Sequence, residues 1–165
     1  MAREIKFRAW IPALEIMLDE IAIYNNGDIG CDIQHLTDKL PSNMVLDYED
    51  SVVFNISKNI GEEMRAVLDV EIGGDWLFIN EPHYLLSQYT GFKDREGKEI
   101  YEGDTFVTGS DKELYAVDSV QGCFVGVNAT RQIYLLADFV VRFMKLTGNI
   151  YQQSKDDENT NDDRG

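Results

Sequence analysis

The sequence predicts a mainly β fold, with an α+β arrangement as the alternative, and three observations lead to this prediction. The opening segment Arg3–Trp10 alternates in polarity along its length. Glycine-containing turn sequences separate short apolar runs between residues 21 and 79. Further short apolar runs, punctuated by glycines, recur from Leu85 to Tyr151. Alternation of period two and closely spaced turns are typical of antiparallel strands, so we expect strands and hairpins followed by a small barrel or sandwich.

The first predicted strand, Arg3–Trp10, should bury one of its faces, and Pro12 should end it. Side chains on a strand point alternately to its two sides. The apolar face consists of Ile5, Phe7 and Ala9, and the opposite face of Lys6, Arg8 and Trp10.

Two hairpins are predicted next, because Asn-Gly and Gly-Gly readily adopt the positive φ angles of tight turns. Asn26-Gly27 separates the runs Ile21–Tyr24 and Ile29–Ile33. Gly73-Gly74 separates the runs Val67–Ile72 and Trp76–Ile79.

A short helix is predicted at Gly61–Leu68, since Glu, Met, Arg, Ala and Leu favour helices and Asn59 is a suitable N-cap. Trp76 and Phe78 share one face of a strand, and we expect that face to pack in the core. The pattern of Pro41–Ser51 predicts no element.

The remaining strands are predicted after residue 85, with Asp138–Met144 as a helical alternative. The runs are Leu85–Tyr89, Ile100–Tyr101, Thr105–Thr108, Leu114–Val120, Cys123–Val127, Gln132–Ala137, Phe143–Leu146 and Ile150–Tyr151. We therefore divide the chain into an acidic β-rich region (1–85), a barrel region (86–151) and an acidic tail (152–165). The end of the tail has no apolar residue, which predicts disorder.

The charge of the chain is concentrated in one half. The formal net charge is −15, and residues 11–85 hold 15 acidic and 3 basic side chains, against 9 and 7 in residues 86–150. A strongly negative surface repels nucleic acid phosphates and attracts basic partners. Direct binding to nucleic acid is therefore not expected, whereas a basic protein is a suitable partner.

Cys31 and Cys123 are too few and too far apart for a disulfide framework, and we expect free thiols in a reducing cytoplasm. The charged start of the chain does not resemble a signal peptide, and no run approaches the ~20 apolar residues of a membrane span. These observations predict a cytoplasmic protein without membrane association.

The segment Gln88–Asp104, QYTGFKDREGKEIYEGD, gathers many charged and aromatic residues. Asp94 is suited to accept hydrogen bonds from the backbone N–H groups that follow it, and Gly97 to adopt a left-handed conformation. Glu102-Gly103-Asp104 then leads into a strand, as at the entrance of an SH3-like barrel. We interpret the segment as architecture rather than as a reactive site.

Catalytic and metal-binding alternatives have little support in this sequence. An EF-hand is excluded, because a loop aligned on Gly97 has Phe92 and Gly103 where ligands are required. Glu96 and Lys98 match a short pattern of magnesium nucleases, with Asp75 as a candidate third residue, but the pattern is unspecific. His35 and His83 lie in no zinc-binding motif, and no hydrolase, phosphate-binding or dinucleotide-binding motif is present. No cofactor is predicted.

Three segments together resemble the YopX family of phage and prophage proteins, whose activity is unassigned. They are Arg3–Trp10, Gln88–Asp104 and the closing Thr147–Tyr151. The resemblance implies that the protein originates from a phage or prophage, is located in the cytoplasm of a bacterial host and has an SH3-like C-terminal part. Assembly into a homo-oligomer is one arrangement that the resemblance allows. It brings no catalytic residue. The motif residues, which we expect to be structural, are Trp10, Tyr89, Thr90, Gly91, Lys93, Asp94, Gly97, Lys98, Tyr101, Glu102, Gly103, Asp104, Gly148, Asn149 and Tyr151.

These observations favour a non-enzymatic accessory protein that binds a host or phage macromolecule through its β surface. A second hypothesis is an acidic mimic of DNA that inhibits a host nucleic-acid-binding protein, which requires its carboxylates to be ordered on one face. A metal-dependent hydrolase built on Glu96, Lys98 and Asp75 is the third.

Overall fold

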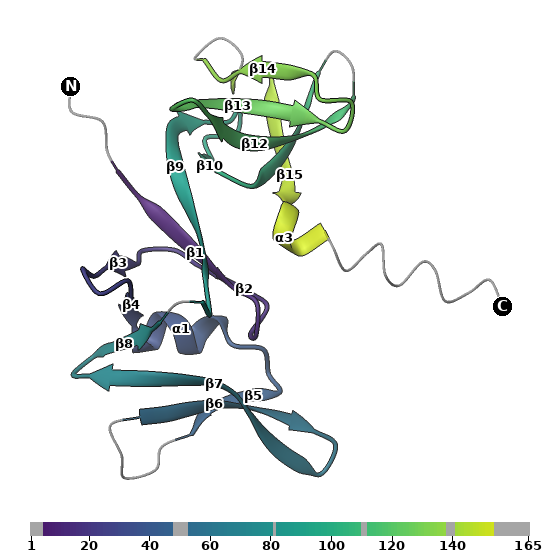
Figure 1. Cartoon of the computed structure of the whole chain (residues 1–165). Coiled ribbons are helices and arrows are strands. Elements are labelled where there is room, and N and C mark those ends of the chain that lie inside the picture. Colours follow the sequence, from purple (N-terminus) through teal and green to yellow (C-terminus); the bar gives the residue numbers. More distant parts are fainter. Residues whose placement is uncertain (1–4, 48–52, 81, 110–111, 138–140, 154–165) are drawn as a thin grey trace, which may run out of the picture. The chain divides into compact units, whose positions relative to one another are not determined.

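The computed structural model describes residues 5–47, 53–80, 82–109, 112–137 and 141–153, and these confirm a mainly β protein (Figure 1). The described helices are α1 (Ile33–Lys39) and α3 (Ile150–Gln153). The strands are β1 (Phe7–Ile11), β2 (Ile16–Leu18), β3 (Ala22–Ile23), β4 (Ile29–Asp32), β5 (Met44–Asp47), β6 (Val53–Ile60), β7 (Glu63–Gly73), β8 (Trp76–Ile79), β9 (Leu85–Lys93), β10 (Glu99–Tyr101), β11 (Asp104–Thr108), β12 (Leu114–Val120), β13 (Cys123–Asn128), β14 (Ile133–Leu135) and β15 (Met144–Asn149).

The chain forms two compact units. The first, which we call the acidic unit, is Phe7–Leu86. The second, the motif unit, combines the described parts of Met1–Lys6 and Ser87–Gly165. The motif unit therefore contains residues from both sides of the acidic unit in sequence.

The acidic unit is built on a six-stranded antiparallel sheet in the order β3-β4-β8-β7-β6-β5. Its core face carries alternate residues such as Cys31, Leu68, Val70, Leu77 and Ile79, all nearly inaccessible to solvent. Side chains of the β1–β2 hairpin and Leu36 of α1 pack in the same core. One face of the sheet is thus covered.

The predicted hairpins around Asn26-Gly27 and Gly73-Gly74 are both present. β3 pairs antiparallel with β4, with Ile23 opposite Ile29. β7 pairs antiparallel with β8, with Gly73 opposite Trp76. Local turn chemistry therefore determines these two connections.

The motif unit contains a five-stranded antiparallel sheet in the order β14-β13-β12-β11-β15 and the antiparallel pair β9–β10. Its core is formed by a second buried cluster that includes Ile100, Phe106, Tyr115, Val117 and Met144. The SH3-like character of this unit remains a prediction.

The prediction of a helix at Gly61–Leu68 is wrong. Gly61 lies in the turn that joins β6 to β7, and Glu63 onward pairs with β6 as a strand. Helix propensity is a weak preference, and cross-strand pairing together with burial of Leu68 overrides it here.

Helix α1 begins at Ile33, which the sequence predicts to be the last residue of the strand Ile29–Ile33. The carboxylate of Asp32 accepts hydrogen bonds from the N–H groups of Gln34 and His35, at 2.9 and 3.1 Å, and thereby caps α1. At the other end of the chain, the expected strand Ile150–Tyr151 is the start of α3.

The alternation predicted for the first strand is also wrong in detail. Ile5 is 67% exposed, whereas Ala9, Trp10 and Ile11 are all buried. The end of β1 is therefore buried on both of its sides. The expected tail beyond residue 153 and part of the helical alternative at residues 138–144 lie outside the described residues.

Candidate functional site

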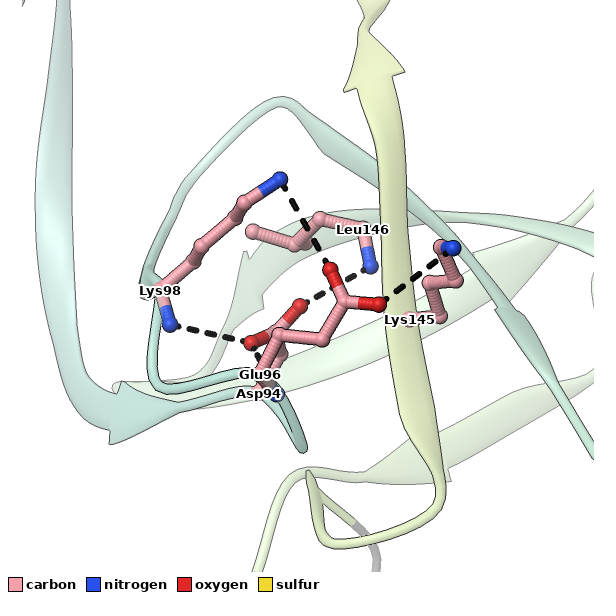
Figure 2. Close-up of polar contacts among 5 residues, drawn as sticks. All are labelled: Asp94, Glu96, Lys98, Lys145 and Leu146. Carbon is pink, nitrogen blue, oxygen red and sulfur yellow. Dashed lines mark hydrogen bonds and ion pairs between the residues drawn. The ribbon is translucent and has the colours of Figure 1, made fainter.

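The turn predicted at Asp94–Gly97 is present and is held by one carboxylate (Figure 2). Asp94 Oδ1 accepts hydrogen bonds from the N–H groups of Glu96, at 2.8 Å, and Lys98, at 2.9 Å. Gly97 adopts a φ of 85°, which a residue without Cβ reaches without strain. Asp94 Oδ2 accepts from the N–H of Leu146 on β15, at 3.2 Å. The side chain therefore ties the turn to a distant strand.

Burial and hydrogen bonding shift the pKa of Asp94 in opposite directions. Burial acts to raise its pKa, but the hydrogen bonds from Lys98, Leu146 and Glu96, together with the charge of Lys98, outweigh burial. The pKa of Asp94 consequently lies below its ordinary value. A carboxylate so fully engaged in hydrogen bonds is suited to a structural role.

The three residues of the nuclease-like pattern are divided between the two units. Glu96 is paired with Lys145, at 3.3 Å, and more loosely with Lys98, at 3.8 Å (Figure 2). Asp75 belongs to the acidic unit, whereas Glu96 and Lys98 belong to the motif unit. In the described part of the chain, no three His, Cys, Asp or Glu side chains are grouped to hold a metal ion.

A second buried carboxylate joins the central and closing motifs. Asp104 is only 3% exposed, and its Oδ2 accepts from the N–H of Tyr101, at 2.9 Å. Its Oδ1 accepts from the side-chain amide of Asn149, at 3.3 Å, and Asn149 Oδ1 accepts from the N–H of Tyr151, at 2.9 Å. Gly103 lies beside this network, with its carbonyl accepting from the N–H of Ile150. Residues 45 positions apart are thus held together.

Aromatic residues of the central motif meet the opening segment around Lys6. Lys6 Nζ lies 2.7 Å from Glu99 Oε1 and 5.5 Å from the centre of the Tyr89 ring. The Tyr101 hydroxyl donates to Glu99 Oε2 at 2.9 Å, and the two tyrosine rings are 5.4 Å apart. The hydrogen bond from Lys6 is the main cause that lowers the pKa of Glu99. All four residues belong to one unit.

The other motif residues occupy ordinary structural positions. Trp10 is buried in β1 of the acidic unit. Thr90 donates its hydroxyl to the carbonyl of Ile100, and Glu102 accepts from the N–H of Gln88. The remaining three lie on strands, namely Gly91 and Lys93 on β9 and Gly148 on β15.

A pocket of about 330 Å³ lies in the motif unit. It is lined by Thr90, Gly91, Phe92, Gly122, Cys123, Phe124, Leu135 and Leu136. This lining is largely apolar and contains no carboxylate, imidazole or amine, so it presents no acid–base pair.

The surface that sequence reasoning missed is the open face of the six-stranded sheet. Leu77 and Ile79 point into the core, so Trp76 and Phe78, which alternate with them, lie on the opposite face. The expectation that Trp76 and Phe78 pack in the core is therefore wrong, and Trp76 is 39% exposed. Tyr24, 41% exposed, packs edge-on against Phe78 with ring centres 5.2 Å apart.

Two carboxylates lie on the neighbouring strand β7. Leu68 and Val70 are buried in the core, so the exposed Asp69 and Glu71 project from the open face. Glu71 is directly opposite Phe78 in the strand register. We call the set Tyr24, Trp76, Phe78, Asp69 and Glu71 the aromatic–acidic face. In the sequence, this face is indicated by the alternation of the carboxylates of β7 with the buried Leu68 and Val70.

Fold and surface together define a small, mainly antiparallel β protein with two units and an exposed aromatic–acidic face. None of its described helices is long and apolar enough to cross a membrane. The chain belongs to the YopX protein family, whose model matches residues 6–155.

Solved structures that are similar to the chain include two bacterial proteins. The crystal structure of protein EF1440 from Enterococcus faecalis is 19% identical, with a TM-score of 0.53, and the match covers 93% of this chain and 98% of that one. Protein yopX from Bacillus subtilis is 15% identical, with a TM-score of 0.39, and the match covers 89% and 93% of the two chains. No curated protein matches the sequence. The first of these likenesses supports the fold alone.

Proposed function

We propose that the chain is a non-enzymatic binding module, a phage or prophage accessory protein of the bacterial cytoplasm, that binds a basic protein through its acidic unit. The observation that carries this proposal is the aromatic–acidic face, where Trp76 and Tyr24 are exposed next to carboxylates. Exposed Trp and Tyr side chains are enriched among the residues that dominate protein interfaces. Cationic partners complement such a surface.

The charge of the acidic unit supports a basic partner over a nucleic acid. Residues 11–85 hold 15 acidic and 3 basic side chains. Phosphate groups would be repelled by this excess, whereas lysine and arginine side chains would be attracted.

The DNA-mimic hypothesis has less support in the geometry. A mimic needs its carboxylates on one face. Asp69 and Glu71 project from the open face, whereas Asp38 lies on α1, which packs against the covered face through Leu36. Glu62 and Glu63 lie at the far end of the β6–β7 hairpin. The described carboxylates of this unit are therefore distributed over several sides.

The test is equilibrium binding of the full chain to two fluorescent probes, an arginine-rich peptide and a DNA duplex. We expect binding to the peptide that weakens as salt is raised, because the Debye length shortens from roughly 30 Å at 0.01 M to roughly 10 Å at 0.1 M ionic strength. We expect no binding to the duplex. Failure to bind the peptide at low salt, or equal binding to the duplex, would overturn the proposal.

A further inference from the structure

The carboxylates and rings of the aromatic–acidic face follow the spacing of a strand. Asp69 and Glu71 are two residues apart on β7, and Trp76 and Phe78 are two residues apart on the neighbouring β8. Residues two apart on a strand share a face and are roughly 7 Å apart. Strands β7 and β8 lie side by side (Figure 1), with Glu71 opposite Phe78 and Gly73 opposite Trp76, so Glu71 lies beside a ring and Asp69 lies two residues further along β7.

Two glycines leave room for the rings to pack close to the backbone of the sheet. A Cβ at Gly30 would lie 2.8 Å from Tyr24 Cε2 and 3.3 Å from both Phe78 and Trp76. A Cβ at Gly73 would lie 3.2 Å from Phe78. Since these positions lack side chains, the rings pack directly over backbone on the solvent side of β4 and β7. The result is a shallow aromatic surface that Glu71 borders through Phe78.

Arginine matches this combination better than lysine. A guanidinium group stacks on an aromatic ring and at the same time donates two parallel hydrogen bonds to a carboxylate, whereas an ammonium group is a compact, strongly hydrated charge. The residues that flank this set in the strand register, Asp32 opposite Trp76 and Asn55 opposite Asp69, add no cation to it. Charge complementarity therefore identifies the class of partner.

We propose that the aromatic–acidic face binds an extended segment of a partner protein that carries arginines at alternate positions, Arg-Xaa-Arg. In such a segment the two arginines point to the same side and are roughly 7 Å apart, which equals the interval between Asp69 and Glu71. The guanidinium that pairs with Glu71 lies against Phe78, and the second guanidinium pairs with Asp69. This inference rests on the proposed function and names the motif that the same surface recognises.

The experiment uses the full chain and short labelled peptides of one composition. One peptide contains Arg-Xaa-Arg, a second contains Arg-Xaa-Xaa-Arg, and a third replaces both arginines of the first with lysine. In an extended segment the second spacing places the arginines on opposite sides. We expect the first peptide to bind about tenfold more tightly than either of the others, since losing one stacked, paired arginine reduces affinity by about that factor.

Matched variants of the protein locate the binding surface. The double variant Asp69→Asn/Glu71→Gln removes two charges from the face, and Glu62→Gln/Glu63→Gln removes two charges at the hairpin end. We expect the first to weaken binding about tenfold and the second less than twofold, since exposed charges away from a contact contribute little. Trp76→Ala should also weaken binding about tenfold. Circular dichroism checks that each variant is folded.

The outcomes separate this inference from the proposed function. If both double variants weaken binding equally, or if the three peptides bind alike, the assigned face and motif are wrong while a general affinity for cations stands. If the unmodified chain binds none of the cationic peptides, the proposed function itself fails.

Discussion

Asp94 and Leu146 are joined across 52 positions of sequence by one hydrogen bond, from the Leu146 N–H to Asp94 Oδ2 at 3.2 Å. The other oxygen of the same carboxylate holds the turn at Glu96 and Lys98. A single side chain thus fixes both the local shape of the motif and its attachment to β15. Replacing it should affect both.

Asp94→Asn should destabilise the protein by about 2 kcal/mol at neutral pH, because an amide cannot accept from all these N–H groups. The folded-state pKa of Asp94 is lowered relative to its ordinary value of 3.8, so its contribution is present above that value and is lost as the pH falls through the folded-state pKa. Chemical denaturation from about pH 7 to about pH 3 measures this. A stability difference between wild type and variant that does not shrink on acidification would contradict the assignment.

Gly103→Ala should be more destabilising than Gly122→Ala, although both glycines have nearly the same φ, 77° and 78°. Alanine at either site incurs the left-handed penalty of about 1 kcal/mol. At Gly103, the new Cβ would also meet Ile150 and Tyr151 at 3.3 Å, whereas at Gly122 nothing lies within 4 Å. Thermal unfolding of both variants isolates the packing contribution. Equal losses of stability in the two variants would show that a Cβ at position 103 does not clash with Ile150 and Tyr151 of α3.

Leu68→Ala should lower the free energy of unfolding by about 2 to 5 kcal/mol, because it removes buried methyl groups from the core of the acidic unit. Met64→Ala, on the same strand, should change it by less than about 0.5 kcal/mol, since Met64 is 48% exposed. Urea denaturation compares the two. Similar losses at both sites would contradict the strand assignment of β7.

The two cysteines should differ in reactivity towards a chromogenic disulfide at about pH 8. Cys123 is exposed and should react quickly. Cys31 is buried, and burial, with a smaller contribution from the charge of Asp32, raises the pKa of its thiol to about 12. It should react only after denaturation. A variant with Cys123→Ser should lose the fast phase, and a persistent fast phase there would show that Cys31 is accessible.

Sequence reasoning succeeded where structure depends on local chemistry. Asn26-Gly27, Gly73-Gly74 and Asp94–Gly97 form turns because their own residues favour these conformations. It failed at Gly61–Leu68, where pairing with β6 overrides helix propensity. It also missed the cap at Asp32, because the predicted strand Ile29–Ile33 took Asp32 as a strand residue between Cys31 and Ile33.

The sequence did not reveal the aromatic–acidic face, for a different reason. The run Trp76–Ile79 is apolar at every position, so its pattern does not reveal which alternate pair faces the core. The pairing with β4 and β7 decides this, and it is a property of the whole sheet. The clue was Leu68–Glu71, where polarity alternates clearly on the adjacent strand.

The contact of Lys6 with Glu99, 93 positions further along, has a consequence for synthesis on the ribosome. The chain emerges from its N-terminus, and domains generally fold as units while it does so. Residues 7–86 are complete before Glu99 is made, so the acidic unit can fold while Lys6 still lacks the strand that it joins. The order of translation therefore favours early folding of the acidic unit and later completion of the motif unit around a segment that was synthesised before that unit's other strands.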